Sequence, residues 1–234
     1  MTDSTVPTSV TRRASARLDD VRGLLDGVHN EITADEWLIV RASIGRLLAK
    51  CNDELLVLDD SLGLPSAQGR ILRYFQLRVG TRVTKEEISG VAGIHAWARR
   101  VRELREDHGW VIHSAGTMGG LGPGEYVMTS DRPDVGLAYS WTLARRMRKL
   151  RTRGGVLPPR ARVLEFLKEL HPRAADREQL AHVAGSESEA GRIVEDLRSE
   201  GWMIELCGTD DVNVPGGVRL LERDRLSGAD HSGS

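Results

Sequence analysis

Residues 93–112 read GIHAWARRVRELREDHGWVI, and this stretch decides the fold of the chain. Its apolar residues first recur at spacings of three and four, which is typical of a helix with one buried face, and later alternate as in a strand. Glycine bounds the helical part at both ends and can adopt the left-handed conformation that terminates a helix. The stretch therefore predicts a helix over about His95–Asp107, followed by a strand at Trp110–His113.

The same pattern occurs a second time, about ninety residues further along the chain. Val91-Ala92-Gly93 corresponds to Val183-Ala184-Gly185, and Gly109-Trp-Val-Ile corresponds to Gly201-Trp-Met-Ile. A unit of about sixty residues that occurs twice indicates a tandem domain, because a solenoid needs three or more shorter repeats.

Each copy predicts the order helix, helix, helix, strand, loop, strand, which is the order of a winged helix. In the first copy the expected helices lie at 69–79, 84–93 and 95–107, and the strands at 110–113 and 125–128. In the second copy the helices lie at 160–170, 176–183 and 186–199, and the strands at 202–206 and 218–221. The predicted fold class is mainly α with small β-hairpins (α+β), with tandem winged-helix domains preceded by a helical hairpin.

Beyond the repeats, two apolar stripes at 3-4 spacing predict the N-terminal helical hairpin, in which Thr33 and Glu36 form a capping box. Asp134 is expected to cap a connecting helix at Val135–Arg153. The expected segments are 1–11 disordered, 12–60 helical hairpin, 66–131 first winged helix, 134–158 basic connecting helix, 159–223 second winged helix and 224–234 disordered tail.

Charge is segregated along the chain, although the net charge is only −1. Residues 61–115 carry 9 basic and 5 acidic side chains, and residues 116–162 carry 9 and 3. Residues 163–234 carry 8 basic and 15 acidic side chains. A basic first repeat and linker within a neutral protein are typical of a protein that contacts phosphate with one part.

The helix of residues 95–107 carries the candidate DNA-reading residues. When Trp97, Val101 and Leu104 face inward, the exposed arc and its flanks hold the cationic residues His95, Arg99, Arg100, Arg102 and Arg105. In a winged helix this face enters the major groove, where arginine can pair with guanine. The alternative is a solvated helix face with pairs such as Arg99–Glu103.

Two further predicted helices carry candidate contact faces. The connecting helix adds the cations Arg145, Arg146, Arg148, Lys149 and Arg151, which are candidates for phosphate contacts or simply a solvated helix. The outward positions of the third helix in the second repeat are Ser188, Gly191, Glu195 and Arg198. Because that face is nearly neutral, we expect it to serve a protein contact, subunit pairing or structural support.

No catalytic, metal or cofactor site is recognisable in these 234 residues. Cys51 and Cys207 stand alone, and no Gly-x-Ser-x-Gly, Lys-containing phosphate loop or metal-ligand pair occurs. No apolar run approaches the roughly 20 residues that a membrane span needs. We therefore expect a cytoplasmic, nucleoid-associated protein that has no enzymatic activity, no cofactor and no membrane partner.

The stretch Gly93–Ile112 resembles the winged-helix domain that accompanies bacterial HNH-type and restriction endonucleases. That family also couples an Arg-Arg-x-Arg-Glu-Leu-Arg helix to a Gly-Trp/Tyr-x-Ile strand, and the resemblance covers Gly69–Thr129 and, more weakly, the second repeat. In that family the domain helps to place the protein on DNA, which implies a reading role for Arg99, Arg100 and Arg102.

These observations predict a sequence-preferring binder of double-stranded DNA, either a transcription regulator or the recognition component of a restriction or defence system. The alternative is a tandem winged-helix scaffold of the chromosome-organising kind that reads no bases. A homodimer could form through residues 12–60 or through the acidic second winged helix.

Overall fold

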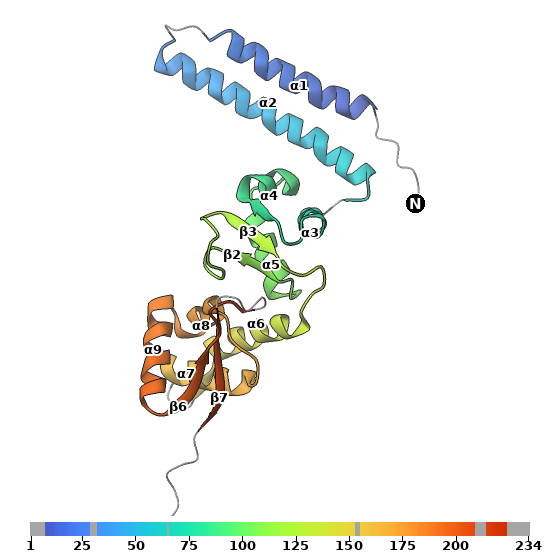
Figure 1. Ribbon diagram of the computed structural model, residues 1–234. Helices are drawn as coiled ribbons and strands as arrows, with labels where there is room; N and C mark the ends of the chain where they lie inside the picture. The colour runs from blue at the N-terminus through green and yellow to red at the C-terminus, as the bar shows by residue number, and fades with distance from the viewer. Residues whose placement is uncertain (1–7, 29–31, 65, 153–154, 209–213, 224–234) are drawn as a thin grey trace, which may run out of the picture. The chain divides into compact units, whose positions relative to one another are not determined.

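The computed structural model describes residues 8–28, 32–64, 66–152, 155–208 and 214–223 (Figure 1). It is mainly helical with small antiparallel sheets, which confirms the predicted α+β class. The chain divides into two compact units, residues 1–71 with 89–97 and residues 72–88 with 98–234. None of the helices in the described ranges is both long enough and apolar enough to cross a membrane.

The first unit contains an antiparallel helical hairpin of α1 (Thr8–Asp26) and α2 (Ala34–Ser61) (Figure 1). The predicted capping box is confirmed: the Thr33 hydroxyl accepts from the Glu36 backbone N–H at 3.3 Å, and the Glu36 carboxylate accepts from the Thr33 backbone N–H at 2.9 Å. Residues 8–11 were expected to be disordered but belong to α1, because Val10 is buried and extends the apolar stripe of this helix. The expected disorder of residues 1–7 and 224–234 concerns positions outside the described residues.

The hairpin buries little within itself. Val10 and Ala14 of α1 and Cys51 of α2 are the fully buried side chains among its described residues. Arg13 Nε lies 2.8 Å from Glu54 Oε2, and the Cys51 thiol donates to the Ala14 carbonyl at 3.7 Å. Both contacts join α1 to α2.

The basic region that the sequence predicts as the first repeat contains three helices and a three-stranded antiparallel sheet. Its elements are α3 (Ala67–Leu77), β1 (Arg82–Thr84), α4 (Lys85–Ala92), α5 (Trp97–Glu106), β2 (Ile112–Ser114) and β3 (Glu125–Met128). The strand order is β1-β3-β2, so the central strand β3 pairs with both neighbours. Strand β1 was not expected from the sequence, and β2 begins two residues later than predicted.

The connecting helix α6 (Val135–Arg148) begins where predicted, because the Asp134 side chain accepts from the Gly136 backbone N–H at 2.7 Å. It ends well before the predicted residue 153, which corrects the assignment of 134–158 as one helix. Two short paired strands follow, β4 (Arg151–Thr152) and β5 (Gly155–Val156). Glycine and proline disfavour a helix in Gly154-Gly-Val-Leu-Pro-Pro159, and Gly155 has a φ of +116°.

The acidic region that the sequence predicts as the second repeat consists of α7 (Pro159–Leu170), α8 (Arg177–Ala184), α9 (Glu187–Ser199), β6 (Trp202–Leu206) and β7 (Val218–Arg223). The strands β6 and β7 form an antiparallel ribbon, and an isolated bridge joins Ala175 to Val218. Its core includes Phe166, Val183, Ile193 and Leu197, together with Trp141, Leu143, Ala144 and Met147 from α6. Helix α6 therefore packs as part of this domain.

One polar contact is made in the same way in both repeats. Arg70 on α3 donates to the Ala92 carbonyl at the end of α4, at 2.6 Å. Arg162 on α7 donates to the Ala184 carbonyl at the end of α8, at 3.0 Å. Each arginine therefore satisfies a carbonyl that a helix terminus leaves without an intrahelical partner.

Candidate nucleic-acid interface

Helix α5 carries the candidate DNA-reading residues and is anchored on one side. Val101 and Leu104 are 3% and 2% exposed, as the sequence predicted for the inward face. The helix ends through backbone bonds from Gly109 N to Arg105 O at 3.1 Å and from Trp110 N to Leu104 O at 3.0 Å. These contacts fix which side of α5 faces solvent.

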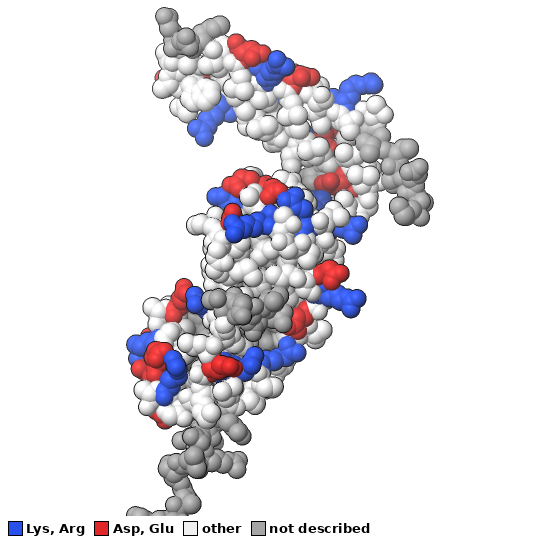
Figure 2. Space-filling model, in the orientation of Figure 1, with Lys and Arg blue, Asp and Glu red and all other residues white. Residues whose placement is uncertain are grey.

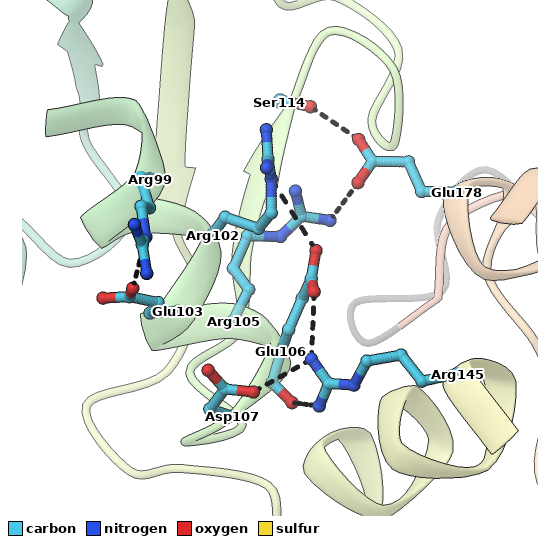
Figure 3. A network of polar contacts seen from close by, with 9 residues as sticks. All are labelled: Arg99, Arg102, Glu103, Arg105, Glu106, Asp107, Ser114, Arg145 and Glu178. Carbon is cyan, nitrogen blue, oxygen red and sulfur yellow. Dashed lines mark hydrogen bonds and ion pairs between the residues drawn. The ribbon is translucent and has the colours of Figure 1, made fainter. Parts of the chain in front are cut away.

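Two predicted arginines lie open on the outer side of α5. The side chains of Arg99 and Arg102 are 71% and 67% exposed. Arg99 Nε lies 3.0 Å from Glu103 Oε1, and Arg102 Nε lies 3.9 Å from Glu106 Oε1. Both pairs join residues one helical turn apart, so each guanidinium already has an anion beside it (Figure 3).

The other predicted residues around α5 are placed differently. Arg100 is 30% exposed and pairs with Glu103 at 2.7 Å. The Glu103 carboxylate therefore pairs with both Arg99 and Arg100. His95 lies in the exposed turn before α5.

Arg105 is not available to solvent in the way that its neighbours are. Its side chain is 12% exposed, and Nη2 lies 2.8 Å from Glu178 Oε2 on α8. Glu178 Oε1 also accepts from the Ser114 hydroxyl at 3.2 Å (Figure 3). The Arg105 guanidinium therefore ties α5 to the second repeat and has little surface left for a phosphate.

The first cations of α6 also meet acidic groups. Arg145 Nη1 lies 3.2 Å from Glu106 Oε2 and 2.9 Å from Asp107 Oδ1 (Figure 3). Burial raises the pKa of Glu106, and the three nearby arginines Arg145, Arg102 and Arg105 oppose that shift. Arg145 therefore stabilises a partly buried carboxylate at the end of α5 and is not a free phosphate ligand.

The remaining candidates spread over α6 and the strand that follows. Arg146 pairs with Glu169, and Arg148 donates to the His182 carbonyl at 2.6 Å. Lys149 and Arg151 are exposed and form no ion pair with any described residue. The structure therefore places Arg146 in an ion pair and Arg148 in a hydrogen bond, and leaves Lys149 and Arg151 exposed.

Arg82 was not predicted as a site residue. It belongs to β1, is 62% exposed and lies 3.5 Å from Glu125 on the neighbouring strand β3. The sequence offered no signal for it, because the three residues of β1 are too short for a periodicity. Arg82 adds an exposed cation to the sheet of the first repeat.

The glycine-rich loop between β2 and β3 is held by hydrogen bonds at both ends. Thr117 N donates to the Ser114 carbonyl at 3.0 Å, and Gly122 N donates to the Glu125 carboxylate at 2.7 Å. Gly124 O accepts from the Lys85 backbone N–H at 2.7 Å, which ties the loop to the start of α4.

The corresponding helix of the second repeat, α9, has a different charge pattern. Arg192 lies between Glu189 at 2.7 Å and Asp196 at 2.9 Å, and Arg198 lies 3.1 Å from Glu195. Figure 2 shows basic and acidic side chains interleaved over this helix. No field of positive charge forms on this visible face of α9.

The first repeat has a match among known protein families. Residues 68–129, about a quarter of the chain, match the KpnI N-terminal domain family. This family is related to restriction enzymes, so the match associates this part of the chain with restriction and defence systems. Comparisons with curated proteins and with solved structures found no match.

The match covers α3 to β3 and therefore includes Arg99, Arg100, Arg102 and Arg105. It ends before α6, so the cations of the connecting helix lie outside it. No group of three or more potential metal-ligating side chains occurs among the described residues.

Proposed function

We propose that this chain recognises double-stranded DNA as part of a restriction or defence system, through the outer face of α5. The observation that carries the proposal is that Arg99 and Arg102 are exposed on the third helix of the region that matches the KpnI N-terminal domain. The proposed role is binding with a sequence preference, and catalysis is not assigned to this chain.

The proposal includes a winged-helix arrangement in each repeat. Support comes from the helix order α3-α4-α5 and from the β1-β3-β2 sheet, in which the last two strands form a hairpin. The bridge between Ala175 and Val218 occupies, in the second repeat, the position that β1 has in the first. In a winged helix the third helix enters the major groove, where each good arginine–guanine pair contributes about 1–3 kcal/mol of discrimination.

The ion pairs on α5 do not prevent this role. An exposed pair such as Arg99–Glu103 contributes at most about 1 kcal/mol, because water screens it and both side chains lose rotamer freedom. A bidentate contact to guanine or a phosphate contact is of equal or greater strength. We therefore expect these arginines to exchange an intrahelical glutamate for DNA when the helix enters the groove.

The decisive experiment replaces both open arginines in the double variant Arg99→Glu, Arg102→Glu. We expect its affinity for duplex DNA to fall by at least about tenfold. The slope of log affinity against log salt concentration should become shallower, because about two fewer counterions are released on binding. The matched control, Arg192→Glu with Arg198→Glu, reverses two exposed arginines on α9 and should leave DNA binding unchanged.

Titration of both variants with fluorescent duplex DNA at two salt concentrations gives the readout, and circular dichroism verifies the fold. Affinity that stays at the level of the unmodified protein in the α5 variant would exclude this face as the DNA-binding surface. Selection from a random DNA pool then tests the sequence preference separately.

We also propose that two copies associate through the hairpin of residues 8–61. Leu18, Leu25, Trp37, Leu48 and Leu55 are 37–53% exposed although they are large and apolar. A hairpin that buries so little within itself gains stability when a second copy covers it. A monomeric mass in sedimentation equilibrium would contradict this part of the proposal.

A further inference from the structure

The second repeat has a hollow beside its third helix, α9. A cavity of about 210 Å³ lies between α8, α9 and the β6–β7 ribbon. Leu180, Ala190, Val194 and Val218 line it and are each 3–5% exposed, so their apolar surface faces the cavity and the core. Leu206 on β6 forms part of the wall and is 55% exposed.

Gly191 keeps this hollow open. It lies on the outer side of α9, and no heavy atom comes within 4 Å of the position that a Cβ would occupy. Any longer side chain at this position would therefore extend into free space beside the cavity. The space is large enough for one aliphatic or aromatic side chain from another molecule.

The rim of the cavity is acidic. Glu187 and Glu195 from α9 line it together with one cation, Arg177 from α8. Glu195 is 68% exposed and lies 3.1 Å from Arg198. The sequence of residues 163–234 as a whole carries 15 acidic and 8 basic side chains. This potential repels a phosphate backbone and attracts a cationic segment.

The two repeats differ in charge at one corresponding position. When Leu104 of α5 is matched to Leu197 of α9, both of which are buried, Arg102 corresponds to Glu195. At this one position the outer face of the third helix therefore carries a cation in the first repeat and an anion, beside an apolar hollow, in the second.

We propose that this groove (Leu180, Ala190, Gly191, Val194, Leu206 and Val218) binds a basic segment of a partner protein. The segment inserts one large apolar side chain between α9 and β6, and lysine or arginine on either side of it pairs with Glu187 and Glu195. An apolar anchor in a pocket with a charged rim is the usual construction of a peptide-binding site. Binding of this segment does not depend on DNA binding by α5.

The test begins with a random peptide library displayed on phage and selected against the full-length chain. We expect enriched sequences in which an aromatic or branched aliphatic residue lies next to lysine or arginine. Synthetic peptides of these sequences are then titrated against the protein by fluorescence anisotropy. A library that yields no enriched sequence, or only acidic or uncharged ones, overturns the proposal.

Two substitutions and one control locate the binding. Gly191→Gln places a neutral side chain in the groove and should weaken peptide binding by at least tenfold. Gly90→Gln on α4 makes the same change at another helical glycine with free space around it and should have no effect. Both changes favour the helix, so neither is expected to unfold the protein. Equal peptide affinity in the two variants overturns the proposal.

Charge is tested in Glu195→Lys, which should weaken binding of the basic peptide at least fivefold and make the remaining affinity less sensitive to salt.

Two other possible occupants of the groove are distinguished in the same series. A dimer that becomes a monomer only in Gly191→Gln would assign the groove to a second copy of the chain. Duplex DNA that displaces the peptide would assign it to nucleic acid. Either result overturns the proposal.

Discussion

Arg105 on α5 donates to Glu178 on α8 across 2.8 Å, although the two residues belong to different repeats. Glu178 also accepts from Ser114, and a Cβ on Gly116 would lie 3.3 Å from its carboxylate. The carboxylate thus reaches into a space that the glycine leaves free. The contact joins the helix proposed to read DNA to the acidic repeat.

Removing the Glu178 carboxylate should weaken the attachment of α5 to α8. In Glu178→Ala the guanidinium of Arg105, which is only 12% exposed, loses the carboxylate that lies 2.8 Å from it. An unsatisfied buried group of this kind costs about 1–3 kcal/mol, so we expect a loss of that size in the free energy of unfolding. Urea denaturation monitored by tryptophan fluorescence measures it.

The control for that change is Glu165→Ala, which removes an exposed pair with Lys168. We expect it to cost less than about 1 kcal/mol, because water screens this pair. Equal losses in the two variants would mean that the Arg105–Glu178 contact contributes no more than an ordinary surface pair.

The neutralising change Glu103→Gln should strengthen DNA binding. The Glu103 carboxylate lies 3.0 Å from Arg99 and 2.7 Å from Arg100. Its neutralisation leaves both guanidinium groups without this partner and makes the net charge of the protein more positive by one unit. We expect the affinity for duplex DNA to rise about three- to tenfold, and the salt dependence to steepen by about one counterion. Electrophoretic mobility shifts at 50 and about 150 mM salt measure both.

The matched control is Glu189→Gln, which frees Arg192 on α9 from one of its two acidic partners. DNA affinity should not change, because α9 lies in the acidic repeat. An increase as large as that of Glu103→Gln would show that net charge, and not the α5 face, determines the affinity.

The sequence predicted the elements better than it predicted the site. Glycine at positions 93 and 109 and polar caps at Thr33 and Asp134 act over one helical turn, and local spacing reveals such effects. The contact between Arg105 and Glu178 is different, because two positions far apart in the sequence meet only after packing. A helical rotation placed Arg105 on the flank of the exposed arc, but it cannot show that a second domain covers that flank.

The buried arginine of the first repeat should matter more than its counterpart in the second. Arg70 is 5% exposed, donates to the carbonyls of Leu64, Val91 and Ala92, and lies 3.2 Å from Asp59. In Arg70→Met these acceptors lose their donor in a buried site, so we expect a loss of about 3–5 kcal/mol in unfolding free energy.

The counterpart variant Arg162→Met removes weaker contacts. Arg162 donates to Ala184 O at 3.0 Å and to Arg148 O at 3.5 Å, and it is half-buried. We expect a loss of about 1.5–3 kcal/mol, since the hydrogen bonds from a guanidinium to two neutral carbonyl oxygens are removed. The order of the two losses, measured by chemical denaturation, checks the comparison. A larger loss for Arg162→Met would contradict it.

Asp176 should make the stability of the second repeat depend on pH. Burial raises the pKa of Asp176 from 3.8 to about 6, and Arg105 opposes this shift. The folded state therefore binds the proton of the Asp176 carboxyl group more tightly than the unfolded state, and protonated Asp176 stabilises the fold. This contribution to the free energy of unfolding is fully present below pH 3.8 and is lost as the pH rises through about 6. The loss is on the order of 3 kcal/mol.

The variant Asp176→Asn isolates this effect. Asparagine also caps helices well, so the N-terminus of α8 is retained while the titrating group is removed. We expect the fall in unfolding free energy between about pH 4 and pH 7 to be smaller in the variant than in the unmodified protein. Parallel slopes for the two proteins would show that Asp176 does not titrate in this range.

Two glycines that correspond in the sequence should respond differently to alanine. Gly109 and Gly201 both have a positive φ, +72° and +89°. At Gly109 a Cβ would overlap the backbone carbonyl oxygen of Asp134, and Gly109 O accepts from the Asp134 N–H at 2.8 Å. At Gly201 no heavy atom lies within 4 Å of the same position.

Gly201→Ala should therefore cost only the backbone strain of a left-handed residue, about 1–2 kcal/mol. Gly109→Ala adds a clash with a carbonyl that cannot rotate away without breaking the hydrogen bond to Asp134 and the start of α6. Overpacking of this kind adds about 1–3 kcal/mol, so the total exceeds that of Gly201→Ala. Thermal unfolding of both variants measures the difference. Equal losses would mean that the backbone around Asp134 yields without cost, and that Gly109 is required only for its dihedral angle.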